Sequence, residues 1–258
     1  MSMLAADNVS KSFGGLRAID GASLSVESGE IHALIGPNGA GKTTFLNLMT
    51  RIYQPDSGVI HFDGHDLLAV APHDIARLGL SRIFQQVELF GALSANDNVM
   101  IGGHVLGKSG LLAGLVQAPS ARLEEQALIQ RAREALDFVG LSALAERSAA
   151  TLTGGQARLL GLARALVSGP KMILLDELVA GLNSRERYEA TLLVRRLRDE
   201  RGITILLIEH DMQFVMSLAD RVSVLDFGRI VAHGTPDQVR GDPAVIEAYL
   251  GGGKYGRA

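Results

Sequence analysis

Cysteine is absent from the 258 residues. Its absence excludes a disulfide-stabilised scaffold, a cysteine-bound zinc or iron–sulfur centre, and a thiol nucleophile. The chain also lacks a run of about eighteen uncharged apolar residues, so we expect no segment to cross a membrane. No basic flank followed by a long apolar core stands at the start, so we expect no signal peptide. Together these absences predict a soluble, cytosolic protein.

A surplus of basic residues is missing as well. Lysine and arginine number 25 against 28 aspartates and glutamates, a net charge of −3. Proteins dedicated to nucleic acids usually carry a basic surplus, so we expect no nucleic-acid partner. Apolar residues make up 47% and charged residues 21% of the chain, which is an ordinary balance for a globular protein.

Short apolar runs alternate with helical patterns along the chain. Residues 31–35, 171–176 and 203–209 have the length and character of buried strands, and a charged helical stretch at 185–201 precedes the last of them. Strands that alternate with helices predict a parallel sheet covered on both faces. The first thirty-five residues instead show the alternation and turn signals of short β-strands.

The middle of the chain has a different character. From about residue 92 to 150 it is rich in Leu, Ala, Arg and Glu. Apolar residues recur at helical spacing between 122 and 139, before Gly140. We therefore expect an inserted helical subdomain.

The segment Gly36–Thr43 fits the P-loop pattern G-x-x-x-x-G-K-[ST]. Its glycines allow backbone N–H groups to turn inward around phosphate oxygens, and the following helix directs its positive end at the same phosphates. Lys42 is expected to reach the β and γ phosphates, and Thr43 to hold Mg²⁺. A strand before the loop and a helix after it match the context that this motif requires.

Two adjacent carboxylates follow a later strand. Asp176 ends an apolar run, which is where an Mg²⁺-binding aspartate belongs in a P-loop enzyme. Glu177 is expected to orient and deprotonate the water that attacks the γ-phosphorus. The pattern thus predicts nucleotide hydrolysis.

A helix is expected to begin within Leu152–Gln156, about twenty residues before Asp176. Thr153 is a good N-cap, and the two glycines after it allow a phosphate to approach the helix N-terminus. With this peptide, the sequence resembles the ATP-binding cassette (ABC) ATPases, whose signature is usually written LSGGQ. The order of P-loop, glutamine, signature, acidic strand end and histidine matches along almost the whole chain.

The resemblance implies further roles, residue by residue. Gln85 matches the glutamine that contacts Mg²⁺ or the attacking water and senses the transport domain, although Gln86 is adjacent and the assignment could slip by one. His210 matches the histidine that contacts the γ-phosphate, residues 180–183 match the D-loop, and Phe13 matches the aromatic residue that stacks on adenine.

These assignments give a complete expected site for ATP and Mg²⁺. The catalytic set is Glu177, His210, Gln85 and Lys42, and the metal set is Thr43, Gln85 and Asp176. The nucleotide set is Phe13, Gly36, Pro37, Asn38, Gly39, Ala40, Gly41, Lys42, Thr43, Thr44, Thr153, Gly154, Gly155 and Gln156.

The resemblance also implies the fold. It is an α/β P-loop NTPase (RecA-like) domain with a parallel-sheet core, an N-terminal antiparallel β subdomain and an inserted helical subdomain. We place the core at 1–84 and 160–258, and the insertion, which carries the signature, at 85–159. Two positions depart from the family pattern: Thr153 stands where Ser is usual, and Leu178 where Pro commonly follows the glutamate.

Within the family, the chain is expected to be a separate subunit of a transporter. The insertion is too short for the coiled-coil arms of repair proteins, one P-loop is too few for translation factors, and fused membrane spans are missing. Residues 10–20, 107–122, 180–183, 206–236 and 242–251 resemble ATPases of branched-chain or hydrophobic amino-acid importers. Urea and aromatic-acid importers look similar.

The importer assignment implies several partners. They are a second ATPase subunit, identical or paralogous, integral-membrane permease subunits and, indirectly, a solute-binding protein, with the chain peripheral on the inner face of the cell membrane. The apolar segment 111–116 either contacts the permease or packs within the helical subdomain. An ATP-gated regulatory module with slow hydrolysis is the alternative, whereas a GTPase switch is disfavoured because no Asn-Lys-x-Asp guanine motif is present.

Overall fold

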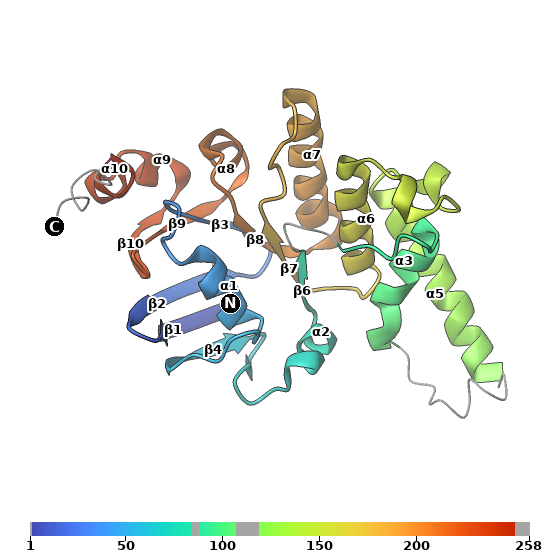
Figure 1. Ribbon diagram of the computed structural model, residues 1–258, viewed down its shortest axis with the longest axis horizontal. Helices are drawn as coiled ribbons and strands as arrows, with labels where there is room; N and C mark the ends of the chain where they lie inside the picture. The colour runs from blue at the N-terminus through green and yellow to red at the C-terminus, as the bar shows by residue number, and fades with distance from the viewer. Residues whose placement is uncertain (1, 84–87, 107–118, 251–258) are drawn as a thin grey trace. The chain divides into compact units, whose positions relative to one another are not determined.

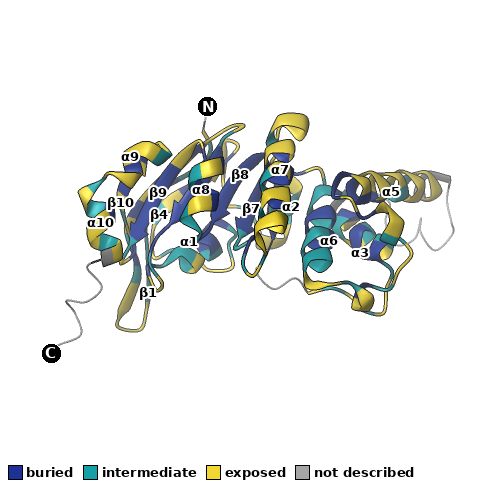
Figure 2. Ribbon diagram, turned by 90° about the horizontal axis from the view of Figure 1, so that it is seen from above, coloured by how far each residue is buried: buried dark blue, intermediate teal, exposed yellow. Residues whose placement is uncertain are grey.

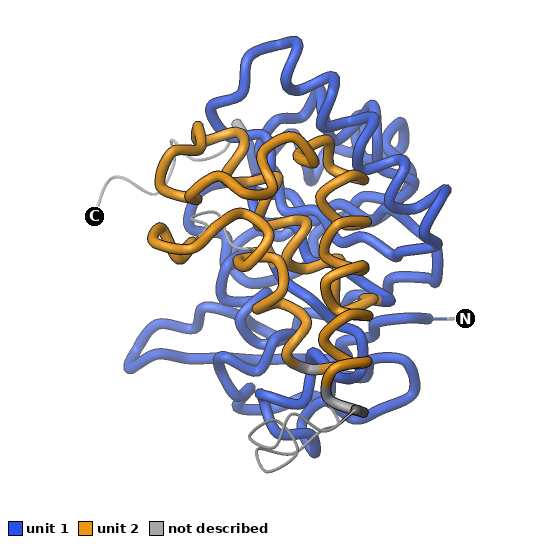
Figure 3. The backbone as a smooth tube through the Cα atoms, turned by 90° about the vertical axis from the view of Figure 1, so that its right-hand side faces the viewer, with its two compact units in different colours: residues 1–82, 171–258 blue, residues 83–170 orange. Residues whose placement is uncertain are grey.

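The computed structural model describes residues 2–83, 88–106 and 119–250, and all structural statements below concern those residues. The chain divides into two compact units, residues 1–82 with 171–258 and residues 83–170 (Figure 3). The predicted bounds of the inserted subdomain, 85–159, remain a prediction. In the part described, no helix combines the length and the apolar character needed to span a bilayer.

The first unit contains a six-stranded sheet in the order β10–β9–β3–β8–β7–β6 (Figure 1). Strand β3 runs parallel to both β8 and β9, β7 runs parallel to β8, and β10 is antiparallel to β9. Almost every residue of β3, β7 and β8 is buried, as predicted for strands covered on both faces. The strands are β3 (Ile31–Ile35), β6 (Leu80–Ile83), β7 (Met172–Asp176), β8 (Thr204–Ile208), β9 (Arg221–Asp226) and β10 (Arg229–Gly234).

A second sheet of four strands lies in the same unit, in the order β2–β1–β4–β5. Strand β1 is antiparallel to β2 and β4, and β4 is antiparallel to β5, as the resemblance to the family implied. The short strands expected from the turn signals are present, although β1 and β2 have 12 residues each. One buried cluster joins side chains of both sheets with those of the helix after β3, so the two sheets share a core. The strands are β1 (Ser2–Phe13), β2 (Leu16–Glu27), β4 (Ser57–Phe62) and β5 (His65–Asp66).

Helices cover the parallel sheet, and the longest in this unit, α7, shows why they form. Asn183 caps its N-terminus in a reciprocal arrangement with Glu186, and Gly202 ends it in a left-handed conformation. One side of α7 is buried and the other exposed (Figure 2). The helical elements are α1 (Lys42–Met49), η1 (Pro72–Asp74), α2 (Ile75–Leu78), α7 (Ser184–Arg201), α8 (Met212–Leu218), α9 (Pro236–Arg240) and α10 (Pro243–Leu250).

The second unit is helical. Its longest helix, α5, ends at Phe138, and the helix predicted between 122 and 139 is therefore present. Helices α3 and α6 approach so closely that a Cβ on Gly102 would lie 1.9 Å from the carbonyl oxygen of Arg164. The elements are α3 (Ala95–Gly102), η2 (Gly103–Leu106), α5 (Pro119–Phe138), η3 (Ser142–Leu144), η4 (Ala149–Thr151) and α6 (Gly154–Leu166).

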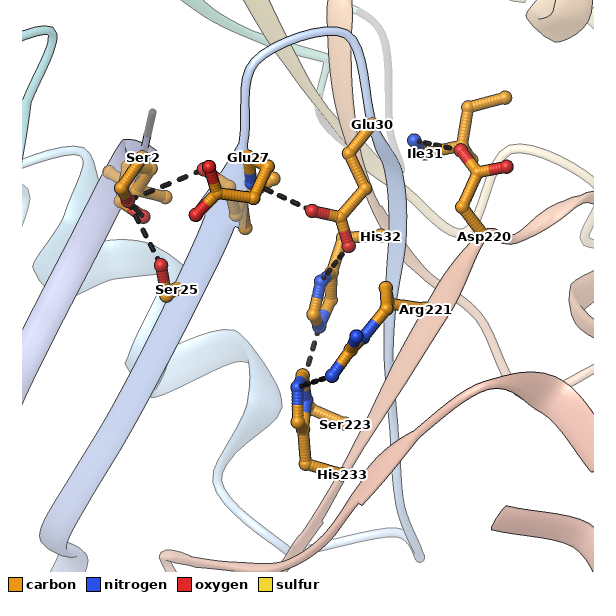
Figure 4. A network of polar contacts seen from close by, with 12 residues as sticks. Ser2, Ser25, Glu27, Glu30, Ile31, His32, Asp220, Arg221, Ser223 and His233 are labelled. Carbon is orange, nitrogen blue, oxygen red and sulfur yellow. Dashed lines mark hydrogen bonds and ion pairs between the residues drawn. The ribbon is translucent and has the colours of Figure 1, made fainter. Parts of the chain in front are cut away.

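A chain of polar contacts crosses strands β3, β9 and β10 (Figure 4). Arg221 donates to Nε2 of His233 at 2.6 Å, Nδ1 of His233 meets the Ser223 hydroxyl at 3.0 Å, and this hydroxyl meets Nε2 of His32 at 2.9 Å. Nδ1 of His32 lies 2.8 Å from the Glu30 carboxylate. Because arginine can only donate, Nε2 of His233 accepts, and each later group can then donate to the next. Both imidazoles are satisfied in their neutral forms.

Ser223 is the buried centre of this network, so Ser223→Ala is predicted to destabilise the fold. The substitution leaves Nε2 of the fully buried His32 without its partner, which typically costs about 1–3 kcal/mol. Urea unfolding measures the loss. The control is Ser25→Ala, because the Ser25 hydroxyl bonds Ser2 in an exposed position. Equal stability of the two variants would contradict the prediction.

Candidate nucleotide-binding site

The loop after β3 has a shape that only glycine permits at two positions. Gly36 has φ +153°, and a Cβ there would lie 2.0 Å from the carbonyl oxygen of Leu225 on β9. Gly41 has φ +107°, and a Cβ there would lie 2.6 Å from the carbonyl oxygen of Ala18. Close packing against β9 and β2 therefore fixes the path of the loop.

Helix α1 begins directly after this loop with an uncapped end. Its N-cap is Gly41, and no side chain of the described residues caps the first turn. The N–H groups of a helix's first turn lack partners within the helix, and they carry partial positive charge. They are thus suited to bind an anionic group such as phosphate.

Lys42 is the first residue of α1, and its side chain reaches back to the loop. Its ammonium donates to the carbonyl oxygens of Gly36 at 2.7 Å and of Pro37 at 2.9 Å. Burial lowers the pKa of Lys42, and the negative charges of Glu177 and Asp176 oppose this effect. The structure therefore brings the P-loop lysine and the two predicted carboxylates within electrostatic reach of one another.

Asp176, at the end of β7, forms a nearly buried ion pair. Nη2 of Arg82 lies 2.8 Å from Oδ2 of Asp176, and Nη1 of Arg82 donates to Oδ1 of Asn47 on α1 at 2.6 Å. The side chains of Arg82 and Asp176 are 6% and 10% exposed. Arg82 thus ties the acidic strand end to the helix that follows the P-loop, a partner that sequence reasoning did not identify.

The donor set fits Mg²⁺ only in part. Thr43 and Asp176 supply oxygen atoms, the donor type that Mg²⁺ prefers. Among the described residues, however, no group of three or more His, Cys, Asp or Glu side chains could hold a metal ion. A metal at this place would need further oxygen atoms, and the phosphates of a bound nucleotide supply them.

Glu177 and His210 come together at the ends of adjacent strands. Oε1 of Glu177 lies 3.9 Å from Nδ1 of His210. Glu177 adopts a left-handed conformation, with φ +52°, and its N–H donates to the carbonyl oxygen of Ile208 at 2.9 Å. A non-glycine residue in this conformation is uncommon and signals that its surroundings hold it.

Glu209, between the end of β8 and His210, was missed in the sequence. Its side chain is fully buried, and its Oε1 accepts from the N–H of Val179 at 3.0 Å. Burial, the largest cause, raises the pKa of Glu209 to about 7, and Glu177 and Asp211 act in the same direction. The available signal was an acidic residue directly after a buried parallel strand, the edge at which such sheets bind ligands.

Phe13, expected to stack on adenine, is partly exposed at the end of β1. Its ring contacts Tyr53 edge-on, with centroids 5.1 Å apart, and Nζ of Lys11 lies 5.5 Å from its centroid. The stacking role remains a prediction. Tyr53 is a second aromatic side chain at this place that the sequence did not indicate.

The signature residues belong to the second unit. The Thr153 hydroxyl accepts from the N–H of Gln156 at 3.3 Å, and the Gln156 side chain accepts from the N–H of Thr153 at 3.0 Å, so they form a capping box. A Cβ on Gly154 or Gly155 would meet no atom of the described residues within 4 Å, so packing against those residues does not require glycine here. Their lack of side chains leaves room for an outside group.

Some predicted residues fall outside the described part of the chain. These are Gln85, with its neighbour Gln86, and the apolar segment 111–116. In the D-loop segment, Asn183 is the N-cap of α7.

Known proteins match along most of this chain. A family model described as ABC transporter matches residues 19–180, and one described as branched-chain amino acid ATP-binding cassette transporter matches residues 229–255. The chain is 44% identical to the high-affinity branched-chain amino acid transport ATP-binding protein BraF of Pseudomonas aeruginosa, covering 93% of this chain and 94% of that protein. It is 41% identical to the corresponding protein LivG of Escherichia coli, over 96% and 98%.

A solved structure agrees with the fold. The crystal structure of the ADP conformation of an ATP-binding cassette of an ABC transporter matches with a TM-score of 0.83 and 33% identity, covering 97% of this chain and 99% of that chain. The predicted fold class is therefore confirmed.

The buried carboxyl of Glu209 is predicted to make stability depend on pH. A pKa raised from 4.5 to about 7 means that the folded chain binds this proton more tightly than the unfolded chain. The resulting stability is present below pH 4.5 and is lost as pH rises through 7. Glu209→Gln removes this pH dependence. The free energy of unfolding of the variant, relative to that of the natural chain, should therefore rise from near zero in acid to at most about 3 kcal/mol at pH 8.

Urea unfolding at several pH values measures this gain. Glu247→Gln, at an exposed position of α10, is the control and should show no comparable trend. A pH-independent difference between Glu209→Gln and the natural chain would show that the carboxyl does not titrate as stated.

Proposed function

Because this chain belongs to the ABC transporter family and is an ATPase, we propose that it is the ATP-hydrolysing subunit of an importer for branched-chain amino acids. Two observations support the substrate class: the match of residues 229–255 to the branched-chain family model, and 41–44% identity to transport proteins of that name over nearly the whole length. The observation that carries the chemistry is the position of Lys42 at the uncapped start of α1, within the electrostatic influence of Asp176 and Glu177.

In this proposal, the P-loop N–H groups and the first turn of α1 bind the phosphates of ATP, and Lys42 exchanges its contacts with loop carbonyls for contacts with phosphate. Bound Mg²⁺, held by Thr43 and Asp176, would neutralise charge on the phosphates. Glu177 accepts a proton from the water that attacks the γ-phosphorus, while ADP leaves with the electrons of the broken bond. His210, next to Glu177, orients this water and the γ-phosphate.

We further propose that two ATPase subunits bind ATP between them. Each contributes its P-loop to one nucleotide and residues Thr153–Gln156 to the other, for which the open surroundings of Gly154 and Gly155 leave room. Phe13 stacks on the adenine, and Gln85 links the nucleotide to the permease. The helical insertion contacts the permease subunits at the inner face of the membrane, and a solute-binding protein delivers the substrate to them.

Reconstitution tests the transport role. The chain is assembled in lipid vesicles with its permease subunits and binding protein, and ATP hydrolysis is measured with leucine, isoleucine, valine or urea. The three branched-chain amino acids are expected to stimulate hydrolysis and to accumulate on the side of the membrane that carries the ATPase subunits. Stimulation by urea alone would overturn the substrate class, and the absence of stimulation by any solute would favour the regulatory module.

Glu177→Gln is predicted to convert the isolated chain from a monomer into an ATP-dependent dimer. Glutamine keeps the shape and one oxygen of the side chain but cannot accept a proton at neutral pH, and loss of a general base slows a reaction by about 10²–10⁴-fold. Removal of a negative charge beside the triphosphate also lessens repulsion in the closed state. Light scattering after size exclusion, with and without ATP, measures the association.

The control adds Thr153→Arg to Glu177→Gln. A bulky side chain at the signature should prevent closure without touching the P-loop of the same chain. Normal ATP hydrolysis by Glu177→Gln would show that Glu177 is not the general base. If Glu177→Gln is inactive but stays monomeric with ATP, the isolated chain does not dimerise by itself, and dimerisation would require the permease subunits.

A further inference from the structure

A buried carboxyl group joins the ends of strands β7 and β8. The side chain of Glu209, which follows β8, accepts a hydrogen bond from the N–H of Val179, three residues after Asp176. We propose that Glu209 is a positioning residue: it holds the turn that carries Glu177 in the conformation needed for ATP hydrolysis. The inference rests on the proposed role of Glu177 as general base.

The turn needs external support because its first residue is strained. Glu177 has φ +52°, a backbone conformation that residues other than Gly, Asn and Asp rarely adopt. Such conformations persist where several surrounding contacts fix them. Two contacts come from the end of β8: the carbonyl oxygen of Ile208 accepts from the N–H of Glu177 at 2.9 Å, and Glu209 accepts from the N–H of Val179 at 3.0 Å.

The residue between these two contacts adds no rigidity of its own. Leu178 stands where a proline ring would fix the backbone angle φ. Both Leu178 and Val179 are buried, at 7% and 3% exposure, so water does not readily replace a lost acceptor for the N–H of Val179. Within the turn, the N–H of Ala180 donates to the carbonyl oxygen of Glu177 at 3.4 Å and the N–H of Leu182 to that of Val179 at 3.1 Å. The hydrogen bond to Glu209 adds a contact from β8 that ties the second half of the turn to the sheet.

The surroundings of the second carboxyl oxygen favour the neutral form of Glu209 over the ionised form. Oε2 of Glu209 is buried and has no hydrogen-bond partner among the described residues. A protonated carboxyl tolerates this surrounding far better than a carboxylate does, in agreement with the pKa near 7 that burial produces. Glutamine has nearly the same shape as glutamate and keeps one acceptor oxygen, so its side chain should still accept the hydrogen bond from the N–H of Val179.

Placement of Glu209 beside His210 gives the contact a functional consequence. Consecutive residues after β8 reach opposite ends of one turn: Glu209 bonds Val179, and His210 lies 3.9 Å from the carboxylate of Glu177. Loss of the first contact should therefore displace Glu177 relative to His210, while the P-loop and Lys42 keep their own contacts. The expected result is slower hydrolysis with unchanged affinity for ATP.

A pair of substitutions separates hydrogen bonding from packing and charge. Glu209→Gln keeps the acceptor and should retain kcat within about twofold, whereas Glu209→Leu fills the space without an acceptor and should lower kcat by roughly 10²-fold, the loss typical of a misplaced catalytic group. KM and the Kd for ATP should stay unchanged in both. Amide hydrogen exchange should be faster in residues 177–183 of Glu209→Leu alone.

Ser223→Ala controls for a general loss of stability, because Ser223 lies in the polar network of β9 and not at the turn. It should retain kcat despite its lower stability. Normal kcat or unchanged exchange in Glu209→Leu would overturn the proposal, as would a Glu209→Gln variant as slow as Glu209→Leu. If Glu177→Gln hydrolyses ATP normally, the role of Glu177 itself is wrong, whereas an inactive Glu177→Gln beside an active Glu209→Leu refutes only the positioning role.

Discussion

Parallel pairing of strands buried on both faces is the constraint on which this molecule depends. Apart from His32, Thr204 and Asp176, the residues of β3, β7 and β8 are apolar and buried, and the common direction of these strands places their carboxyl ends at one edge of the sheet. The P-loop, the acidic pair after β7 and the histidine after β8 are consequently neighbours, although more than 160 residues separate the first from the last. The chemistry of the site follows from where the apolar runs end.

Local patterns were sufficient to predict many of the strands and helices, and they suggested the residues of the candidate site. Apolar runs of strand length, the spacing of Gly36–Thr43 and the adjacency of Asp176 and Glu177 are properties of short segments, and the structure contains the corresponding strands and loop. The N-terminal strands and the helical second unit were likewise expected from turn signals and composition, whereas the antiparallel arrangement of those strands came from the resemblance to the family.

Contacts between distant residues could not be predicted in this way. Arg82 is one basic residue among many in the sequence, and only the fold shows it paired with Asp176, 94 positions away, and with Asn47. Glu209 reads as a polar residue at a strand end, and its burial depends on segments that pack around it from elsewhere in the chain. Such side chains share a property: their roles depend on partners that no local pattern specifies.

The packing of the P-loop against the β9–β10 hairpin limits how this region can evolve. The N–H of Gly228 donates to the carbonyl oxygen of Ala40 at 2.8 Å, and Gly36 packs against the backbone of Leu225, so the hairpin supports the loop with its main chain. Substitution of surface side chains leaves these main-chain contacts in place. Insertion or deletion of a single residue between 225 and 228 moves them, so this turn should keep its length. It should also keep Gly228, which has φ +77° and where a Cβ would lie 2.7 Å from the carbonyl oxygen of Ala18.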